Sequence, residues 1–418
     1  MSDAKEPPGA TTTEGHEPKA LPGSASKNGG AAATATPTLS AAPTATPTNG
    51  THSNGSSTNG ENGEADLIVD AAVPAADLAQ LTFDAERLIA ADPTRDLDER
   101  LEAYENIVDS EIGDTMQVRA RNLEREVGKR QLYLKFEGGN TTGTQKDRIA
   151  FAQAMDALRQ GYDSITTATC GNYGVALALA AKCARLKCVV YMPHTYKSPR
   201  VGEMEALGAR IVRVPGDYEH AVDVSSVAAS QSQLYDANPG GANTNLQLKA
   251  YGHIAYEIYD DLRDAPAAVA VPVSNGTTLA GIYRGFLRLY RRGKTSRMPR
   301  FVAGSSYRKN PIVQSFLKGV ATCEDLAPAA IRETETNEPL INWHSTEGQE
   351  ALAAVRATNG WAAYASDRDM RRFARLLREK EGVTVLPAAT AGLIALLEGK
   401  PDESITNDRF VAILTGRR

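Results

Sequence analysis

The chain has 418 residues, of which 42% are hydrophobic and 23% are charged, a composition typical of a globular protein with one large or two medium-sized cores. Its formal net charge is −5 and its lysines and arginines are scattered, so we expect no nucleic-acid partner. No apolar run reaches about 18 residues, so we expect a soluble cytoplasmic protein with no membrane partner. We expect no metal site and reduced cysteines, because Cys170, Cys183, Cys188 and Cys323 lack paired metal-ligand spacing.

Residues 1–65 consist mainly of alanine, threonine, proline, glycine, serine and asparagine. Leu21 and Leu39 are the only large aliphatic residues in this segment, and it has no aromatic residue. Such a segment cannot bury enough apolar surface to offset the entropy lost on ordering, so we predict a disordered tail. A transit peptide is the alternative, and it is disfavoured because the segment contains acidic residues and no arginine.

From residue 66 onward, short β-branched apolar runs alternate with longer amphipathic ones. We predict strands over residues 164–169, 188–193, 210–215, 268–273, 300–306 and 409–416. Near-continuous apolar strands separated by helical segments indicate parallel sheets covered by helices on both faces. We therefore predict an α/β fold with right-handed connections, and we expect ligands to bind at loops beyond the carboxyl ends of the strands.

The first loop of interest is GGNTTGTQKDRIA, residues 138–150. Thr142 or Thr144 can cap a helix whose apolar stripe includes Ile149, which places Lys146 in the first helical turn. The positive end of the helix dipole lowers the pKa of an amine at that position and favours the neutral form, which attacks carbonyl groups. An ordinary surface lysine is the alternative interpretation.

The second loop is TCGNYG, residues 169–174, which joins a predicted strand to a predicted helix. Its glycines allow a tight turn whose backbone amides face the end of the sheet. Asn172 can direct its side-chain amide to a ligand oxygen, or it can cap the following helix.

The third loop comprises Ser274, Asn275, Gly276, Thr277 and Thr278, between another predicted strand and helix. Hydroxyls and backbone donors at a helix N-terminus suit a phosphate dianion. The loop matches neither the P-loop pattern nor the dinucleotide fingerprint, so we expect a phosphate without a nucleotide.

A lysine suited to imine formation, a nearby asparagine and a separate phosphate loop together describe a site for pyridoxal phosphate. The motifs resemble those of the fold-type II pyridoxal-phosphate enzymes, and within them the threonine synthase-like group. NTTGTQKDR is similar to that group's segment around the cofactor-binding lysine, TCGNYG to the loop that faces the cofactor ring, SNGTTLAG to the phosphate loop and ILTG to a late loop. The resemblance spans roughly residues 110–416.

This resemblance implies a tryptophan synthase β-like architecture, in which two lobes with open parallel sheets hold the cofactor between them. The large lobe would comprise about residues 66–155 and 255–418, and the small mobile lobe about residues 156–254. A homodimer is expected from the family.

The resemblance also implies roles for single residues. Lys146 would form the Schiff base with pyridoxal 5'-phosphate and then act as the catalytic base. Asn172 would contact the phenolic oxygen of the cofactor, and residues 274–278 would bind its phosphate. Thr415 would face its pyridine nitrogen. Thr169, Cys170 and Gly171 would receive the substrate carboxylate, although Cys170 can equally be a small buried filler.

Asn243, Thr244 and Lys249 lie in a segment similar to one that binds the substrate phosphate in threonine synthases. Lys249 stands where that group has an arginine, so it would supply a point charge in place of a bidentate fork. Lys197 and Arg200 are the other cations that we consider for a substrate phosphate.

The activity implied by the resemblance is elimination from the side chain of an O-activated amino acid followed by addition of a nucleophile, as when threonine synthase releases phosphate from O-phosphohomoserine. A cysteine synthase-like β-replacement on O-phosphoserine or O-acetylserine, a serine or threonine dehydratase, and a non-catalytic binding protein are the alternatives. A phosphorylated substrate needs a cationic pocket, so the charge of the pocket distinguishes among these substrates.

Overall fold

The computed structural model describes residues 75–169, 171–399 and 405–417. All of them belong to one compact unit, Ala71–Arg418. The predicted tail over residues 1–65 lies outside the described residues, as does Cys170. Within the described ranges, no helix combines the length and the apolar character that crossing a membrane requires.

The larger sheet in the described part of the chain has six strands in the order β1-β2-β10-β7-β8-β9. The strands are β1 (Gln117–Arg119), β2 (Leu132–Phe136), β7 (Ala268–Pro272), β8 (Arg300–Ser306), β9 (Trp361–Ala365) and β10 (Phe410–Leu414). Neighbouring strands are parallel except β1 and β2, which are antiparallel. β7 and β10 are buried along their whole length, as expected for strands covered on both faces.

The smaller sheet has the order β5-β4-β3-β6, and all its neighbouring strands are parallel. The strands are β3 (Ser164–Ala168), β4 (Lys187–Pro193), β5 (Arg210–Val214) and β6 (Tyr235–Asp236). The six strands expected from sequence are present, with small shifts at their ends, whereas β1, β2, β6 and β9 were not predicted. The predicted α/β fold with two largely parallel sheets is confirmed.

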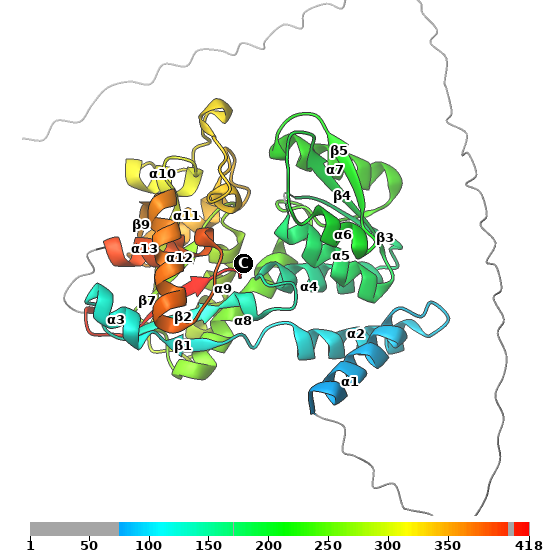
Figure 1. The fold of residues 1–418 in the computed structure, drawn as a ribbon, viewed down its shortest axis with the longest axis horizontal. Coiled ribbons are helices and arrows are strands. Elements are labelled where there is room, and N and C mark those ends of the chain that lie inside the picture. The colour runs from blue at the N-terminus through cyan, green and yellow to red at the C-terminus, as the bar shows by residue number, and fades with distance from the viewer. Residues whose placement is uncertain (1–74, 170, 400–404, 418) are drawn as a thin grey trace, which may run out of the picture. The chain divides into compact units, whose positions relative to one another are not determined.

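Helices surround both sheets (Figure 1). The α-helices are α1 (Ala75–Ala90), α2 (Leu97–Glu111), α3 (Arg121–Val127), α4 (Lys146–Arg159), α5 (Asn172–Ala184), α6 (Val201–Ala206), α7 (Tyr218–Ser232), α8 (Thr244–Leu262), α9 (Thr277–Arg291), α10 (Pro311–Lys318), α11 (Gly348–Ala357), α12 (Asp367–Glu381) and α13 (Ala391–Glu398). Short 3-10 helices are η1 (Glu137–Gly139), η2 (Pro328–Ala330), η3 (Glu338–Leu340) and η4 (Pro387–Thr390).

α7 packs on β3 and β4, and α13 packs on β7 and β8. α4 contacts α5, which packs on the smaller sheet, and also contacts α8. α8 in turn packs on α9, which contacts the larger sheet, so packed helices join the two sheets.

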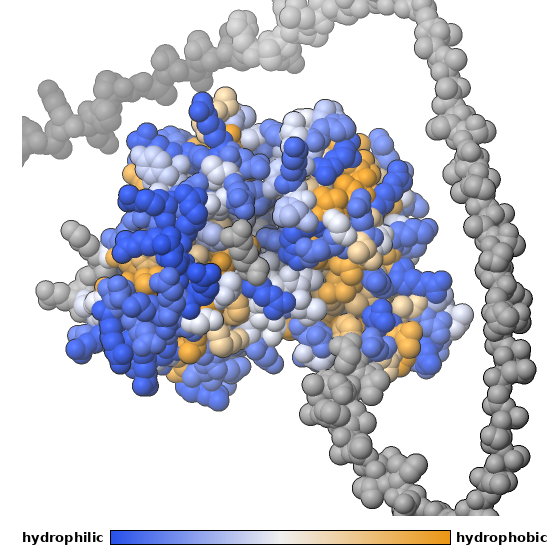
Figure 2. All heavy atoms as spheres, in the orientation of Figure 1, coloured by the Kyte–Doolittle hydropathy of each residue, from blue (hydrophilic) through white to orange (hydrophobic). Residues whose placement is uncertain are grey.

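Several helix ends follow directly from the local sequence. The Asn310 side chain accepts hydrogen bonds from the backbone N–H groups of Ile312 (3.1 Å) and Val313 (3.2 Å) and so caps α10, which ends at Gly319 in the left-handed conformation (φ 72°). α12 begins in the same way at Ser366, and its many charged residues form a hydrophilic surface in Figure 2. These caps fix the lengths of the helices that cover the larger sheet.

Candidate active site

A cavity of about 380 Å³ lies at the carboxyl ends of strands from both sheets, since it is lined by residues at the ends of β3, β4 and β7 and by a residue just after β10. This is the position at which α/β sheets bind ligands. The predicted site residues that line it are Lys146, Thr169, Gly171, Asn172, Ser274, Asn275, Gly276, Thr277, Thr278 and Thr415. The structure therefore brings three separate sequence motifs and the late ILTG segment to one cavity.

The three residues at the start of α8 that were predicted to bind a substrate phosphate are not part of this lining. Asn243, Thr244 and Lys249 are absent from it, and Cys170 is outside the described residues. Lys249 is exposed, because the buried face of α8 is formed by other residues of the helix, such as Leu248 and Ile258. Gln247 of the same helix does line the cavity, so the structure brings this part of α8 to the site through Gln247 and not through the three predicted residues.

Lys146 is the first residue of α4, and its side chain lines the cavity. Burial lowers the pKa of its amine to about 8, and the carboxylates of Glu347 and Glu338 partly oppose this effect. Its Nζ atom lies 5.6 Å from the centroid of the Tyr173 ring. The sequence predicted a lowered pKa from the helix dipole, and the structure gives burial as a cause of the lowering. Near neutral pH, a useful fraction of the amine is unprotonated and able to react with a carbonyl group.

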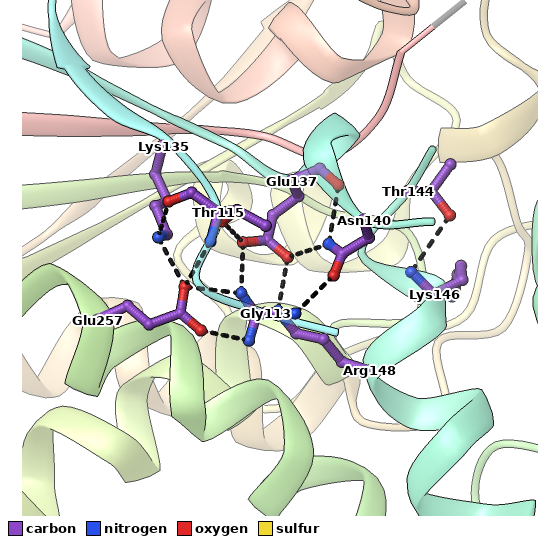
Figure 3. A network of polar contacts seen from close by, with 9 residues as sticks. All are labelled: Gly113, Thr115, Lys135, Glu137, Asn140, Thr144, Lys146, Arg148 and Glu257. Carbon is purple, nitrogen blue, oxygen red and sulfur yellow. Dashed lines mark hydrogen bonds and ion pairs between the residues drawn. The ribbon is translucent and has the colours of Figure 1, made fainter. Parts of the chain in front are cut away.

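A network of buried charges fixes the segment that carries Lys146 (Figure 3). Arg148 donates from Nε to Glu137 and from Nη1 to Glu257, in both cases at 2.6 Å. Lys135 on β2 also forms an ion pair with Glu257, at 2.6 Å. Charge-assisted hydrogen bonds from the planar guanidinium impose a defined geometry. The network therefore holds the first turn of α4 against β2 and α8.

Backbone hydrogen bonds tie the same segment to the residues after β10. The N–H of Gln145 donates to the carbonyl oxygen of Thr415 at 3.0 Å, and the N–H of Arg417 donates to that of Gly143 at 2.9 Å. Gly143 has φ 90°, a conformation that glycine adopts without strain. Thr415 is thus held beside the Lys146 loop, although the two residues are far apart in the sequence.

Asn172 is positioned by a hydrogen bond from Arg200. It is the first residue of α5, and Gly171 is the residue that precedes the helix, so Asn172 does not occupy the capping position. Its Oδ1 accepts a hydrogen bond from Nη1 of Arg200 at 2.9 Å, while Arg200 also pairs with Glu203 at 2.8 Å. Because the amide oxygen is engaged, the amide N–H groups are left to donate toward the cavity.

The third loop forms a tight turn at the start of α9. Gly276 has φ 92°, and a Cβ at this position would lie 2.9 Å from both the carbonyl oxygen of Glu347 and the Cβ of Ala351. The first backbone N–H groups of the 15-residue helix α9 have no partner within the helix and lie at its positive end. The Thr277 hydroxyl donates to Oε2 of Glu347 at 2.5 Å. This geometry provides backbone donors for an anion beside the Lys146 amine.

Four acidic residues that the sequence patterns did not reveal also line the cavity: Asp217, Glu219, Glu333 and Glu338. Burial raises the pKa of Glu338 to about 7 and also raises the pKa values of Glu333 and Glu219. Asp217 carried only the signal of a helix cap, which it fulfils at the start of α7. Glu333 and Glu338 belong to a segment with no helical or strand periodicity, so no sequence signal placed them at the site.

A family described as pyridoxal-phosphate dependent enzyme matches residues 108–416, a range that contains Lys146, Asn172, the turn at Gly276 and Thr415. The chain belongs to this family. As a pyridoxal-phosphate dependent enzyme, it is similar to threonine synthase of Methanocaldococcus jannaschii, with 29% identity over 307 residues, or 73% of this chain and 74% of the relative. The predicted resemblance to the threonine synthase-like group is confirmed at this level.

Solved structures share the fold of this pyridoxal-phosphate dependent enzyme. Maize serine racemase matches with a TM-score of 0.63 and 18% identity, covering 76% of this chain and 92% of its own. The processed form of threonine deaminase isoform 2 from Solanum lycopersicum matches with a TM-score of 0.60 and 18% identity, covering 78% of this chain and 92% of its own. The predicted fold-type II architecture is therefore confirmed.

The residues of the cavity fit pyridoxal 5'-phosphate, the cofactor of this family. An aldehyde needs an unprotonated amine, and the amine of Lys146 has a pKa lowered to about 8 by burial. A phosphate needs a cradle of backbone donors, and the turn at Gly276 leaves no room for a Cβ and opens onto the N-terminus of α9. Both groups lie in the lining of one cavity.

Proposed function

We propose that this pyridoxal-phosphate dependent enzyme removes a leaving group from the side chain of an O-activated amino acid and adds a nucleophile in its place, in the manner of threonine synthase. The observation that carries the proposal is the single cavity shared by the amine of Lys146, the amide of Asn172, the turn at Gly276 and the hydroxyl of Thr415. The similarity to threonine synthases supports the same class of reaction.

In this proposal each motif holds one part of the cofactor. The backbone N–H groups that follow Gly276, with the hydroxyl of Thr278, bind its phosphate, and the amide of Asn172 donates to its phenolic oxygen. The amine of Lys146 would hold its aldehyde group, and the hydroxyl of Thr415 would lie on the side of its ring nitrogen. When bound, the cofactor supplies an electron-withdrawing ring conjugated with the α-carbon of the substrate.

Lys146 moves the proton in the first step. With a pKa of about 8, its Nζ is close to half unprotonated under mildly alkaline conditions, and it can accept the proton of the substrate α-carbon. The hydroxyl of Thr169 accepts the backbone N–H of Gly171 at 3.3 Å, which leaves its own O–H to donate to the substrate carboxylate, and both residues line the cavity beside Asn172.

Thr415 directs the outcome of that proton transfer. Its side chain is an uncharged hydroxyl, which can donate a hydrogen bond to a ring nitrogen but does not stabilise a protonated one as a carboxylate would. This arrangement favours loss of a side-chain leaving group over transfer of the amino group.

Hydrogen bonds also join the two sides of the cavity wall. The carboxylates of Asp217 and Glu219 on the smaller-sheet side accept hydrogen bonds from Trp343, which belongs to the segment after α10. These bonds fasten the smaller-sheet side of the wall to the segment after α10.

A cysteine synthase-like β-replacement, a dehydratase and a binding protein without turnover are the competing proposals. They differ in product: replacement consumes a second substrate, a dehydratase releases a keto acid without one, and a binding protein releases nothing.

We further propose a homodimer in the cytoplasm, with a small lobe over residues 156–254 that closes on a large lobe formed by residues 66–155 and 255–418.

The test is the visible absorption spectrum of the purified protein with pyridoxal 5'-phosphate, followed by separate additions of O-phosphohomoserine, O-phosphoserine, O-acetylserine and threonine. We expect a lysine-linked cofactor band that an amino acid shifts, together with release of its leaving group. Lys146→Ala should lose the band and the activity while its circular dichroism spectrum stays that of the parent protein. A band in the Lys146→Ala variant, or a parent protein that releases no leaving group from any of the four compounds, would contradict the proposal.

A further inference from the structure

The amide of Gln247 is a buried polar group at the cavity to which none of the proposed cofactor contacts gives a role. Gln247 lies on α8, is only 1% exposed and lines the cavity. Buried polar groups in proteins have hydrogen-bond partners, and an atom without one needs an explanation. The partners of the two ends of this amide therefore show what it can bind.

The nitrogen of the Gln247 amide is fully occupied by other residues of the protein. Nε2 donates to the backbone carbonyl oxygen of Asn238 and to Oε1 of Gln153, in both cases at 3.1 Å, and Oδ1 of Asn243 is a third acceptor at 3.3 Å. A backbone carbonyl can only accept, so the amide cannot be turned round without losing that bond. The orientation of Gln247 is therefore fixed. Asn243, which was predicted to bind a substrate phosphate, supports Gln247 instead.

Gln153 connects this amide to the helix that carries Lys146. The two residues are seven positions apart on α4, so they lie on one face of the helix, about 10 Å apart along its axis. Nε2 of the buried Gln153 donates to the carbonyl oxygen of Ile149 at 3.2 Å and to the hydroxyl of Tyr173, whose ring lies beside Nζ of Lys146. Gln247 is therefore held on the same wall of the cavity as the reacting amine.

The oxygen of the Gln247 amide is free, since no donor from the described residues reaches Oε1. In the same part of the chain, the side-chain atoms that are sealed from solvent without a hydrogen bond are Arg87 Nε, Gln117 Oε1, Tyr251 Oη and Thr295 Oγ1. Oε1 of Gln247 does not belong to this group, so it is open to the cavity that the residue lines. The cavity thus contains an oriented, uncharged acceptor.

An amide oxygen of this kind distinguishes ligands by whether they can donate a hydrogen bond. The hydroxyl of an amino acid and a water molecule both carry O–H donors. A phosphate dianion and an acetyl ester only accept, and a thiol is a weak donor. The acceptor therefore suits an O–H group and not a phosphate, an ester or a sulfur nucleophile.

We propose that Gln247 is a specificity-determining residue whose Oε1 accepts a hydrogen bond from an O–H group beside the side chain of the bound amino acid. The O–H belongs either to that side chain or to the water that replaces the leaving group. The proposal rests on the proposed function, because it names the class of nucleophile at the same site. In the second case the leaving group departs with the electron pair of its bond to carbon, and the water oxygen forms the new bond with a lone pair. The proton that water loses goes to the solvent, since a neutral amide orients water but does not deprotonate it.

The first test measures binding of matched amino acids to the full-length protein loaded with cofactor, by calorimetry and by the visible spectrum in parallel. L-threonine and L-valine have nearly the same shape and differ in one hydroxyl on the β-carbon. L-homoserine and L-norvaline differ in the same way on the γ-carbon. We expect the hydroxyl member of one pair to bind about tenfold more tightly than its partner, as one hydrogen bond to a fixed acceptor provides.

Variants of Gln247 connect this preference to the amide. Gln247→Met removes the acceptor at nearly constant length and should bring the hydroxyl preference close to one. Gln247→Asn keeps the amide but shortens the side chain by one methylene, so it should lower the preference by about threefold and serves if the methionine variant does not fold. Gln231→Met is the matched control, since Gln231 is exposed on α7 and outside the cavity lining, and it should retain the full preference.

The second test examines water as the source of the O–H group, by turnover of O-acetylserine and O-phosphohomoserine. Addition of an oriented water gives a hydroxy amino acid, whereas loss of the leaving group without addition gives a keto acid. We expect Gln247→Met to lower the ratio of hydroxy amino acid to keto acid by about tenfold and Gln231→Met to leave it unchanged. A general loss of activity reduces both products equally and does not move this ratio.

The outcomes separate the role of Gln247 from the reaction. A hydroxyl preference that disappears in Gln247→Met assigns the O–H group to the amino acid, and a fall in the product ratio assigns it to water. Equal binding within both pairs together with an unchanged product ratio would overturn the proposal, as would a full preference in both Gln247 variants. If the hydroxyl preference appears but no compound loses its leaving group, the role of Gln247 stands and the proposed reaction fails. Release of a leaving group with neither effect of Gln247 means the reverse.

Discussion

Glu257→Gln should lower the free energy of unfolding by about 3 kcal/mol. Burial by itself would raise the pKa of Glu257. Hydrogen bonds and charges from Arg148 and Lys135 outweigh this effect of burial and lower the pKa of Glu257 from 4.5 to about 2. That difference corresponds to about 3 kcal/mol of stabilisation, and removal of one partner from a buried ion pair costs about 3 to 5 kcal/mol. Lys135 is only 1% exposed, so the variant leaves a buried ammonium without a carboxylate.

Urea unfolding of the variant and the parent at pH 7 measures this change. Asp261→Asn on the same helix is the matched control, because Asp261 is exposed and its change should stay within about 0.5 kcal/mol. The folded-state pKa of Glu257 lies below its unfolded value, so its contribution is present above about pH 4.5 and is lost as the pH falls toward about 2. The parent and the variant should therefore converge in stability on acidification. A difference below about 1 kcal/mol at pH 7, or one that does not shrink at low pH, would refute the role given to the network.

Three further results are expected. Gly276→Ala should weaken cofactor binding and destabilise the fold by about 1 to 3 kcal/mol, because φ at this position is 92° and the new Cβ would lie 2.9 Å from a backbone oxygen. Cofactor titration and urea unfolding measure the two effects, and values equal to those of the parent protein would contradict the tight turn. The rate of cofactor attachment should rise with pH and level off above about pH 8, because Lys146 loses its proton in that range. A stopped-flow series at different pH values measures this rate, and a rate that keeps rising to pH 10 would mean that the pKa of the Lys146 amine is not lowered. Arg200→Ala should weaken cofactor binding by about fivefold, since Asn172 loses the hydrogen bond that orients its amide, whereas Arg185→Ala at the far end of α5 should not.

The buried parallel strands were predictable because their residues are apolar without interruption, as in β7 and β10. β2 was not, because it contains Lys135, whose charge is compensated by Glu257 from a distant helix. β1 depends on its antiparallel pairing with β2 and is too short to carry a pattern of its own. Local sequence thus reveals the strands that are apolar throughout, although they too pair with distant strands, and misses the strand with a buried charge and the strand that is too short to show a pattern.

The candidate site divides in the same way. Asn172 and Gly276 could be predicted because a strand-to-helix turn has a position that is fixed by the sheet. Lys146 could be predicted from its place in the first turn of a helix and from the motif around it. Lys249 was assigned by alignment to a motif, although the apolar spacing of α8 already indicated that it lies on the outer face. Glu338 could not be found, because its place on the wall depends on the packing of a segment without regular periodicity.

The position of β10 has a consequence for how the protein is made. This strand is the last to leave the ribosome among those described, yet it pairs on one side with β2 and on the other with β7. Until it emerges, both of those strands have an open edge that can pair with another chain, and the nascent polypeptide lacks the backbone partners of Gln145 and Gly143. The loop that carries Lys146 therefore gains its full set of backbone bonds only after β10 has paired, and a chain without β10 exposes two strand edges.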